Sequence, residues 1–99
     1  MNQNDDFIQK NLDKLMLTVG ELHLSLRTKN CLTNLGIKDI GELIQYSEKD
    51  LIRSRNFGSK SLSELKSLLD SFGLSFETKI IWPPENYEQL KRKAKKMYL

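Results

Sequence analysis

No pattern in this chain narrows the choice of fold more than a stripe of apolar residues in its second half. Leu62, Leu65, Leu69 and Phe72 follow one another at spacings of three and four residues, and Gly73 comes directly after them. This spacing puts the four side chains on one face of a helix, and glycine readily takes the left-handed conformation that ends one. The pattern predicts an amphipathic helix over residues 59–72.

The first 20 residues consist of a short polar segment followed by a segment with helical periodicity. Residues 1–6 are polar and charged without apolar periodicity, which predicts disorder. A set of apolar residues then falls on one helical face before Gly20, which predicts a lead-in helix or an ordered linker. These residues are Ile8, Leu12, Leu15, Met16 and Val19.

Three short helices are predicted next, each after a residue that can cap it. Ser25, Asp39 and Ser47 carry side-chain oxygens that can accept a first-turn backbone N–H. The helices are expected over residues 26–35, with Gly36 as the stop, over residues 40–46, and directly after Ser47. Their inward-facing residues are expected to be Cys31, Leu32, Leu35, Ile40, Leu43, Ile44, Leu51 and Ile52.

The end of the sequence reads as an irregular segment followed by a helix. Residues 74–82 are expected to be extended or irregular, with a weak strand candidate from Thr78 to Trp82, and Pro83-Pro84 disfavours helix just before it. Residues 85–98 predict an amphipathic helix with an apolar side and a basic side. The basic residues are Lys91, Arg92, Lys93, Lys95 and Lys96. Taken together, the patterns predict an all-α fold.

Composition excludes several classes of protein. With 99 residues the sequence makes one small domain, and it has no apolar run long enough to span a membrane. Its start does not resemble a secretory signal. A single cysteine, Cys31, allows neither an internal disulfide nor a multi-thiolate zinc site, which favours a cytosolic location. The net charge of +3 is a mild lean toward a polyanionic partner.

The sequence predicts no catalytic centre, cofactor or metal site. The only histidine, His23, lies eight residues before Cys31, with no third group to orient them. A free cysteine among leucines is more often a small core residue than a nucleophile. The acidic residues lack metal-ligand spacing, and no phosphate-binding loop or dinucleotide fingerprint occurs.

The most informative stretch precedes the strongest helix and runs from Asn56 to Ser61. A glycine turn that leads into a helix presents free backbone N–H groups, which attract phosphate together with the helix dipole. Lys60 adds a cation and Ser61 a hydroxyl. In the alternative interpretation, Asn56 and Gly58 only shape a turn and Ser59 caps the helix.

Two further sets of polar residues fit a DNA surface. Arg27, Asn30 and Asn34 are spaced to lie on one side of a helix, and these residue types contact base edges or enter a minor groove. Arg53 and Arg55 flank the turn before Gly58, where they could contact a DNA backbone. Each set is also compatible with an ordinary solvated surface.

From Glu21 to Pro84 the sequence resembles the C-terminal domain of the bacterial RNA polymerase alpha subunit. The resemblance covers about two-thirds of the residues and rests on five motifs. They are Glu21 to Leu32 (ELHLSLRTKNCL), Ile40 to Ile44 (IGELI), Asn56 to Leu62 (NFGSKSL), Phe72 to Ser75 (FGLS) and Trp82-Pro83-Pro84.

The resemblance implies a compact bundle of four to five short helices with helix-hairpin-helix-like units, an irregular lead-in and, here, a C-terminal tail helix. It implies binding to the minor groove of AT-rich upstream promoter DNA and docking of transcription activators and sigma factor. It implies the remainder of RNA polymerase as a partner, no membrane, and a cytoplasmic location at the bacterial nucleoid. The domain itself is expected to be non-catalytic and to divide into residues 1–20 (linker), 21–82 (DNA-binding domain) and 83–99 (basic tail).

The family's DNA-contacting positions correspond here to Arg27, Asn30, Cys31, Arg53, Asn56, Gly58, Lys60, Ser61 and Glu64. Arg27 is expected to enter the groove, because narrow AT-rich grooves concentrate negative potential. Asn30 is expected to support it. Gly58 is expected to let the backbone approach a phosphate that Lys60 neutralises. Glu64 is expected to orient Arg27 or its neighbours by charge pairing.

Three positions depart from the family pattern. His23 stands where an acidic sigma-contacting residue is common, although Glu21 keeps acidity nearby; Arg55 replaces a common proline; and Ser59 replaces a common basic residue. The departures at His23 and Arg55 leave open a module that mainly docks proteins and binds DNA secondarily. An unrelated helix-hairpin-helix accessory domain is the third alternative. The length predicts either a fragment of an alpha subunit or a free-standing domain.

Overall fold

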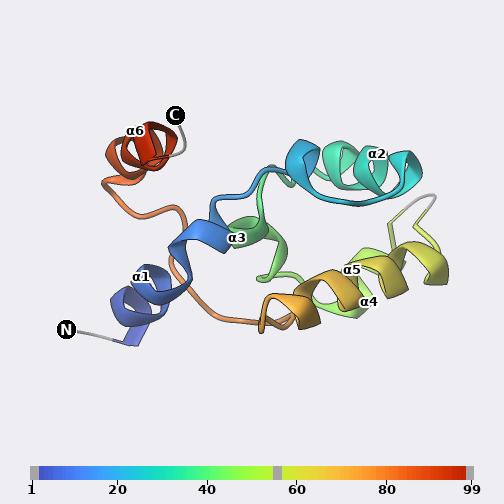
Figure 1. Ribbon diagram of the computed structural model, residues 1–99. Coiled ribbons are helices and arrows are strands. Elements are labelled where there is room, and N and C mark those ends of the chain that lie inside the picture. Colours follow the sequence, from blue (N-terminus) through green and yellow to red (C-terminus); the bar gives the residue numbers. More distant parts are fainter. Residues whose placement is uncertain (1–2, 55–56, 98–99) are drawn as a thin grey trace.

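The computed structural model describes residues 3–54 and 57–97, and these residues form six α-helices and one 3-10 helix (Figure 1). The elements are α1 (Gln3–Leu15), η1 (Val19–Glu21), α2 (Leu26–Asn34), α3 (Ile40–Leu43), α4 (Glu48–Ile52), α5 (Ser59–Ser71) and α6 (Tyr87–Met97). No strand occurs in the described residues, and Thr78 to Trp82 is irregular. The predicted all-α class is confirmed.

The lead-in is a helix from its third residue onward, so the predicted disorder of residues 1–6 is wrong for residues 3–6. Asp5 and Asp6 lie in the first turn of α1, where negative charge is favoured by the helix dipole. The backbone N–H of Ile81 donates to Asn4 Oδ1 at 2.7 Å, so a distant segment holds this turn. That tertiary contact explains why local composition was a poor guide here.

The three predicted caps are confirmed. The side chains of Ser25, Asp39 and Ser47 accept hydrogen bonds from the N–H groups of the residues three positions further on. Gly36 and Gly73 have φ angles of 79° and 72°, in the left-handed region expected after a helix end.

Two predictions in the middle of the sequence are wrong. The helix after Asp39 ends at Leu43, not at residue 46, because the carbonyls of Ile44 and Tyr46 accept hydrogen bonds from Thr78 and Glu77. Ile52 was expected in the core but is 52% exposed. Its neighbour Leu51 is fully buried, because consecutive residues of a helix point in different directions and in α4 only Leu51 points into the core.

One hydrophobic cluster joins the N-terminal helix to the rest of the fold. Ile8 and Leu15 of α1 belong to the same buried cluster as Leu32 of α2, Leu43 of α3 and Leu65 of α5. The stripe predicted for α5 faces this cluster, with Leu65 and Leu69 buried and Leu62 and Phe72 packed at its edge. The division of the sequence at residues 20 and 82 stays a prediction.

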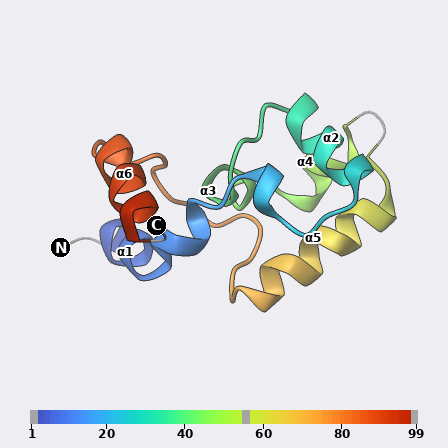
Figure 2. The same cartoon turned by 45° about the horizontal axis from the view of Figure 1, so that its top comes forward.

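The segment after α5 returns across α3 to α1. Trp82 packs against Gly41, and its indole N–H donates to Asp39 Oδ1 at 3.1 Å. Tyr87 at the start of α6 donates its hydroxyl to Asp39 Oδ2 at 3.0 Å. In both Figure 1 and Figure 2, α6 and α1 lie at one end of the molecule and α2 and α5 extend to the other. No helix among the described residues is long and apolar enough to cross a membrane.

Candidate nucleic-acid interface

The N-terminal turns of α2 and α5 are joined by hydrogen bonds to a single carboxylate. Glu64 of α5 accepts the backbone N–H of Ser25 at 2.9 Å through Oε1 and the Ser25 hydroxyl at 2.9 Å through Oε2. Its Oε2 also accepts the hydroxyl of Thr28. The Thr28 and Ser61 hydroxyl oxygens lie 2.9 Å apart, and both residues are buried. These contacts fix the start of α2 against the first turns of α5.

This network changes the role expected for Glu64. The Thr28 hydroxyl and the Ser25 backbone N–H hold the pKa of the Glu64 carboxyl below its usual range. The expected charge pair with Arg27 does not form among the described side chains; the Glu64 carboxylate instead accepts hydrogen bonds from Ser25 and Thr28. Glu64 therefore orients Arg27 only indirectly, by fixing the helix turn on which Arg27 lies.

The outer face of α2 carries the predicted Arg/Asn set. Arg27, Asn30 and Asn34 are all exposed, and Leu26 beside them is 73% exposed. Together with Cys31 these residues line a shallow hollow on the surface. Cys31 itself is 5% exposed, so it can form the floor of the hollow but offers little surface to a ligand.

The first turn of α5 lies next to this face. Gly58 is the N-cap residue and supplies no side-chain hydrogen bond, so the interpretation of Ser59 as the cap is wrong. The early N–H groups of a helix have no partner within the helix, and a helix N-terminus favours an anion. A Cβ placed on Gly58 would meet nothing within 4 Å, so internal packing does not require glycine there.

Two exposed basic side chains lie near this turn, one on each side of it. Lys60 is exposed in the first turn of α5, four residues before Glu64, whose carboxyl pKa its charge also lowers. Arg53 is exposed at the C-cap of α4, on the other side of the turn. Asn56 and Arg55 lie outside the described residues.

The hydroxyl of Ser61 does not lie where the sequence suggested. Its side chain is 4% exposed and faces Thr28 rather than the surface. Its position in the third residue of α5 leaves only its backbone N–H near the helix start. The reason is helical geometry, since Ser61 lies on the same face as the buried Leu65.

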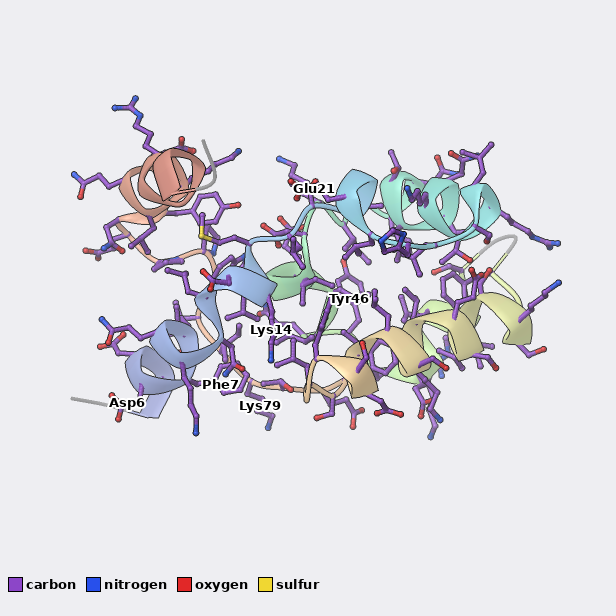
Figure 3. The ribbon with its side chains drawn as sticks, in the orientation of Figure 1. Asp6, Phe7, Lys14, Glu21, Tyr46 and Lys79 are labelled. Carbon is purple, nitrogen blue, oxygen red and sulfur yellow. The ribbon has the colours of Figure 1, made fainter. Side chains whose placement is uncertain are left out.

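The two predicted protein-docking residues lie on adjoining but different surfaces. The carboxylate of Glu21 is exposed and accepts the backbone N–H of Thr18 at 2.8 Å, between α1 and α2 (Figure 3). His23 is exposed and lines a second shallow hollow with Lys60, Glu64 and Leu68 of α5. The structure thus brings His23 to the α5 side of the candidate interface.

Sequence reasoning missed two features of this site. Thr28 was not singled out, although its spacing of three from the cap Ser25 was a usable signal for a first-turn contact. The bonds from Ser25 to Glu64 span 39 residues, and no local pattern indicates them.

The arrangement combines exposed cations with the start of a helix, which suits the binding of an anion. Arg27, Lys60 and the start of α5 provide cations and N–H groups on one end of the molecule. Among the described residues, no group of three histidine, cysteine or acidic side chains could hold a metal ion. Such a surface suits a nucleic acid. Arginine and asparagine can enter a groove, and a helix N-terminus can contact the phosphate backbone.

Comparison with known proteins gives one consistent family. Residues 5–71 match the family described as the C-terminal domain of the bacterial RNA polymerase alpha chain. A DNA-directed RNA polymerase subunit alpha from Lawsonia intracellularis (strain PHE/MN1-00) is 46% identical over 81 residues, which is 82% of this chain and 23% of that protein. The same subunit from Orientia tsutsugamushi (strain Ikeda) is 46% identical over 85 residues, 85% of this chain and 25% of that protein. The chain spans about a quarter of the length of these relatives.

A solved structure agrees with the sequence matches. The NMR structure of the C-terminal domain of the RNA polymerase alpha subunit from Helicobacter pylori has a TM-score of 0.61 to this protein at 34% sequence identity. The similarity covers 88% of this chain and 75% of the Helicobacter pylori domain.

Proposed function

Because this protein belongs to the family of C-terminal domains of bacterial RNA polymerase alpha chains, we propose that it binds the minor groove of AT-rich upstream promoter DNA through α2 and the start of α5. In this role it acts at the nucleoid as a non-catalytic part of RNA polymerase, and polymerisation belongs to other parts of the enzyme. It also docks activators and sigma factor, through surfaces that include Glu21 and His23.

The observation that carries this proposal is the exposed Arg27–Asn30 face beside the uncapped N-terminus of α5. AT-rich tracts have a narrow minor groove whose negative potential attracts an inserted arginine. A phosphate of the adjoining backbone would be received by the first-turn N–H groups of α5 and by Lys60. Glu64 supports this geometry because it fixes the turn that carries Arg27 relative to α5.

The proposal predicts weak, salt-sensitive binding that favours AT-rich duplex. Fluorescence-anisotropy titrations with AT-rich and GC-rich duplexes at two salt concentrations would measure it, since phosphate contacts make affinity depend on salt. Arg27→Ala is expected to weaken AT-rich binding by about 1–3 kcal/mol and to remove most of the preference for AT-rich DNA.

Lys79→Ala is the matched control, because it removes one exposed cation far from α2 (Figure 3). It should leave the AT preference intact. Equal binding of both duplexes by the unaltered protein, or an unchanged preference in Arg27→Ala, would reject the groove assignment. Normal regulator binding by an Arg27→Ala protein that has lost DNA binding would separate the docking role from the DNA role.

A further inference from the structure

Helix α6 concentrates the positive charge of the molecule. It holds five of the 16 basic residues and one of the 13 acidic residues. The other 88 positions therefore hold 11 basic against 12 acidic residues, a formal charge of −1, although the protein as a whole has +3. The attraction of this protein for polyanions thus depends on where α6 lies and which side it presents.

The side of α6 that faces the body is fixed by aromatic contacts. The rings of Tyr87 and Trp82 meet edge to face with centroids 5.4 Å apart, and both residues bond to the buried carboxylate of Asp39. Burial and the hydrogen bond to Asp39 raise the pKa of Tyr87 to about 12, so this hydroxyl stays a donor at neutral pH. The ammonium of Lys91 lies 5.9 Å from the centre of the Tyr87 ring.

Over residues 87–92, whose side chains the structure describes, the opposite side of α6 is exposed to solvent. Arg92 is exposed, while Tyr87 and Leu90 are part-buried. Lys96 follows Arg92 by four residues, which is one turn further along the helix. A helix that lies in a membrane surface needs its apolar side free. In α6 Tyr87 is used for docking onto the body, so a membrane is a poor partner.

The position of α6 separates it from the α2–α5 face. Both views place α6 at the end of the molecule opposite to the far ends of α2 and α5, and the longest dimension of the fold is 37 Å (Figures 1 and 2). Charges that far apart in salt solution act on a ligand independently, because the Debye length at physiological salt is about 8 Å.

We propose that α6 is a second, sequence-independent binding surface for the phosphate backbone of duplex DNA, held in place by the Trp82–Tyr87–Asp39 contacts. The identity of the ligand rests on the proposed function, whereas the surface rests on the charge and docking of α6. Lysine and arginine contacts to phosphate add affinity without reading sequence. On this basis α6 strengthens binding to any duplex, and the α2–α5 face supplies the preference for AT-rich DNA.

The test compares salt dependence in two charge-reversal variants of the 99-residue protein. Arg92→Glu/Lys96→Glu changes α6, and Lys49→Glu/Lys79→Glu makes the same change in net charge elsewhere. Each phosphate contact contributes about 0.9 to the slope of log K against log salt. The α6 variant is expected to lower that slope by about 2 and to weaken binding about tenfold at low salt, equally for AT-rich and GC-rich duplexes. The control variant is expected to keep the slope of the unaltered protein.

A slope in the α6 variant equal to that of the unaltered protein would overturn the proposal, as would an equal loss in both variants. Circular dichroism and the fluorescence of Trp82, the only tryptophan, check that both variants stay folded. Arg27→Ala made in the α6 variant separates the two proposals. If it leaves the AT preference unchanged while α6 still sets the slope, the groove assignment fails and the α6 surface stands.

Discussion

The carboxylate of Glu64 joins α2 to α5 by hydrogen bonds. The free energy of unfolding therefore depends on whether this carboxyl is ionised. Its pKa is lowered in the folded protein by the Thr28 hydroxyl and the Ser25 N–H. A carboxyl with a lowered folded pKa adds stability above its ordinary value of 4.5, and that stability is lost as the pH falls through the folded value. The junction between α2 and α5 should therefore weaken in acid.

We expect Glu64→Gln to lower the free energy of unfolding at pH 7 by about 1–2 kcal/mol, because hydrogen bonds to a charged acceptor become bonds to a neutral amide. The difference from the unaltered protein should shrink as the pH falls below 4.5. Urea unfolding at a series of pH values measures this. Glu85→Gln, an exposed change with the same loss of charge, is the control. A difference that stays constant across the pH range would mean that packing, not charge, explains the loss.

The sequence predicts the role of a residue correctly where that role depends on neighbours along the chain. Ser25, Asp39 and Ser47 were identified as caps because a cap depends on the next three residues, and all three are confirmed. The roles of Glu64 and Asp39 as long-range acceptors could not be predicted, since their partners lie 36 to 48 residues away along the sequence.

At the scale of elements, the sequence predicts a helix in each place where an α-helix occurs, but some of the predicted helix ends are wrong. The start of α1 is held by Ile81 and the end of α3 is set by residues 77 and 78, so both ends depend on contacts that periodicity does not contain. The candidate interface follows the same rule. The exposed Arg/Asn face of α2 and the inward position of Ser61, four residues before the buried Leu65, both follow from helical spacing. The contact of Ser61 with Thr28, 33 residues away along the sequence, does not.

The docking of the C-terminal segment depends on a glycine. A Cβ at Gly41 would lie 2.2 Å from an atom of the Trp82 ring, far closer than a carbon contact allows. Gly41→Ala should displace Trp82 from α3 and cost about 1–3 kcal/mol through overpacking. Because Trp82 is the only tryptophan, a red shift and greater quenching of fluorescence would report its release.

Gly20→Ala is the matched control for this change, because a Cβ there would meet nothing within 4 Å. It should leave the fluorescence of Trp82 unchanged. An unchanged spectrum in Gly41→Ala as well would contradict the packing of Trp82 on α3, and with it the anchoring of α6.

At the scale of the whole molecule, the two proposed binding surfaces depend on the single hydrophobic core and on the uneven distribution of charge. The 21–82 region alone holds nine basic and eight acidic residues, so the DNA face proposed for it depends on the placement of Arg27 and Lys60 and not on net charge. The net positive charge comes from α6, which holds five basic residues and one acidic residue and is tied to the same core through Asp39 and Trp82. The proposal gives general DNA affinity to α6 and the preference for AT-rich DNA to the α2–α5 face. It therefore requires that these two ends of the molecule fold as one unit.

That requirement is tested at Leu15, which is fully buried although it lies in the segment expected to be a linker. Leu15→Ala should lower the free energy of unfolding by about 2–5 kcal/mol, because it removes buried methyl groups and leaves a cavity. For a domain of this size each kcal/mol corresponds to about 4–8 °C in Tm. Ile81→Ala, at a side chain that is 75% exposed, is the control and should change little.

The unfolding of Leu15→Ala must also be cooperative if α1 belongs to the core. Amide NMR signals of α5, Trp82 fluorescence and helical circular dichroism should then disappear in one coincident transition, as expected for two-state unfolding. A partial loss of helix signal, with the α5 signals melting at the temperature of the unaltered protein, would instead make α1 a detachable lead-in. In that case the boundary at residue 20 would be physical, and α6 would depend on α3 alone for its position.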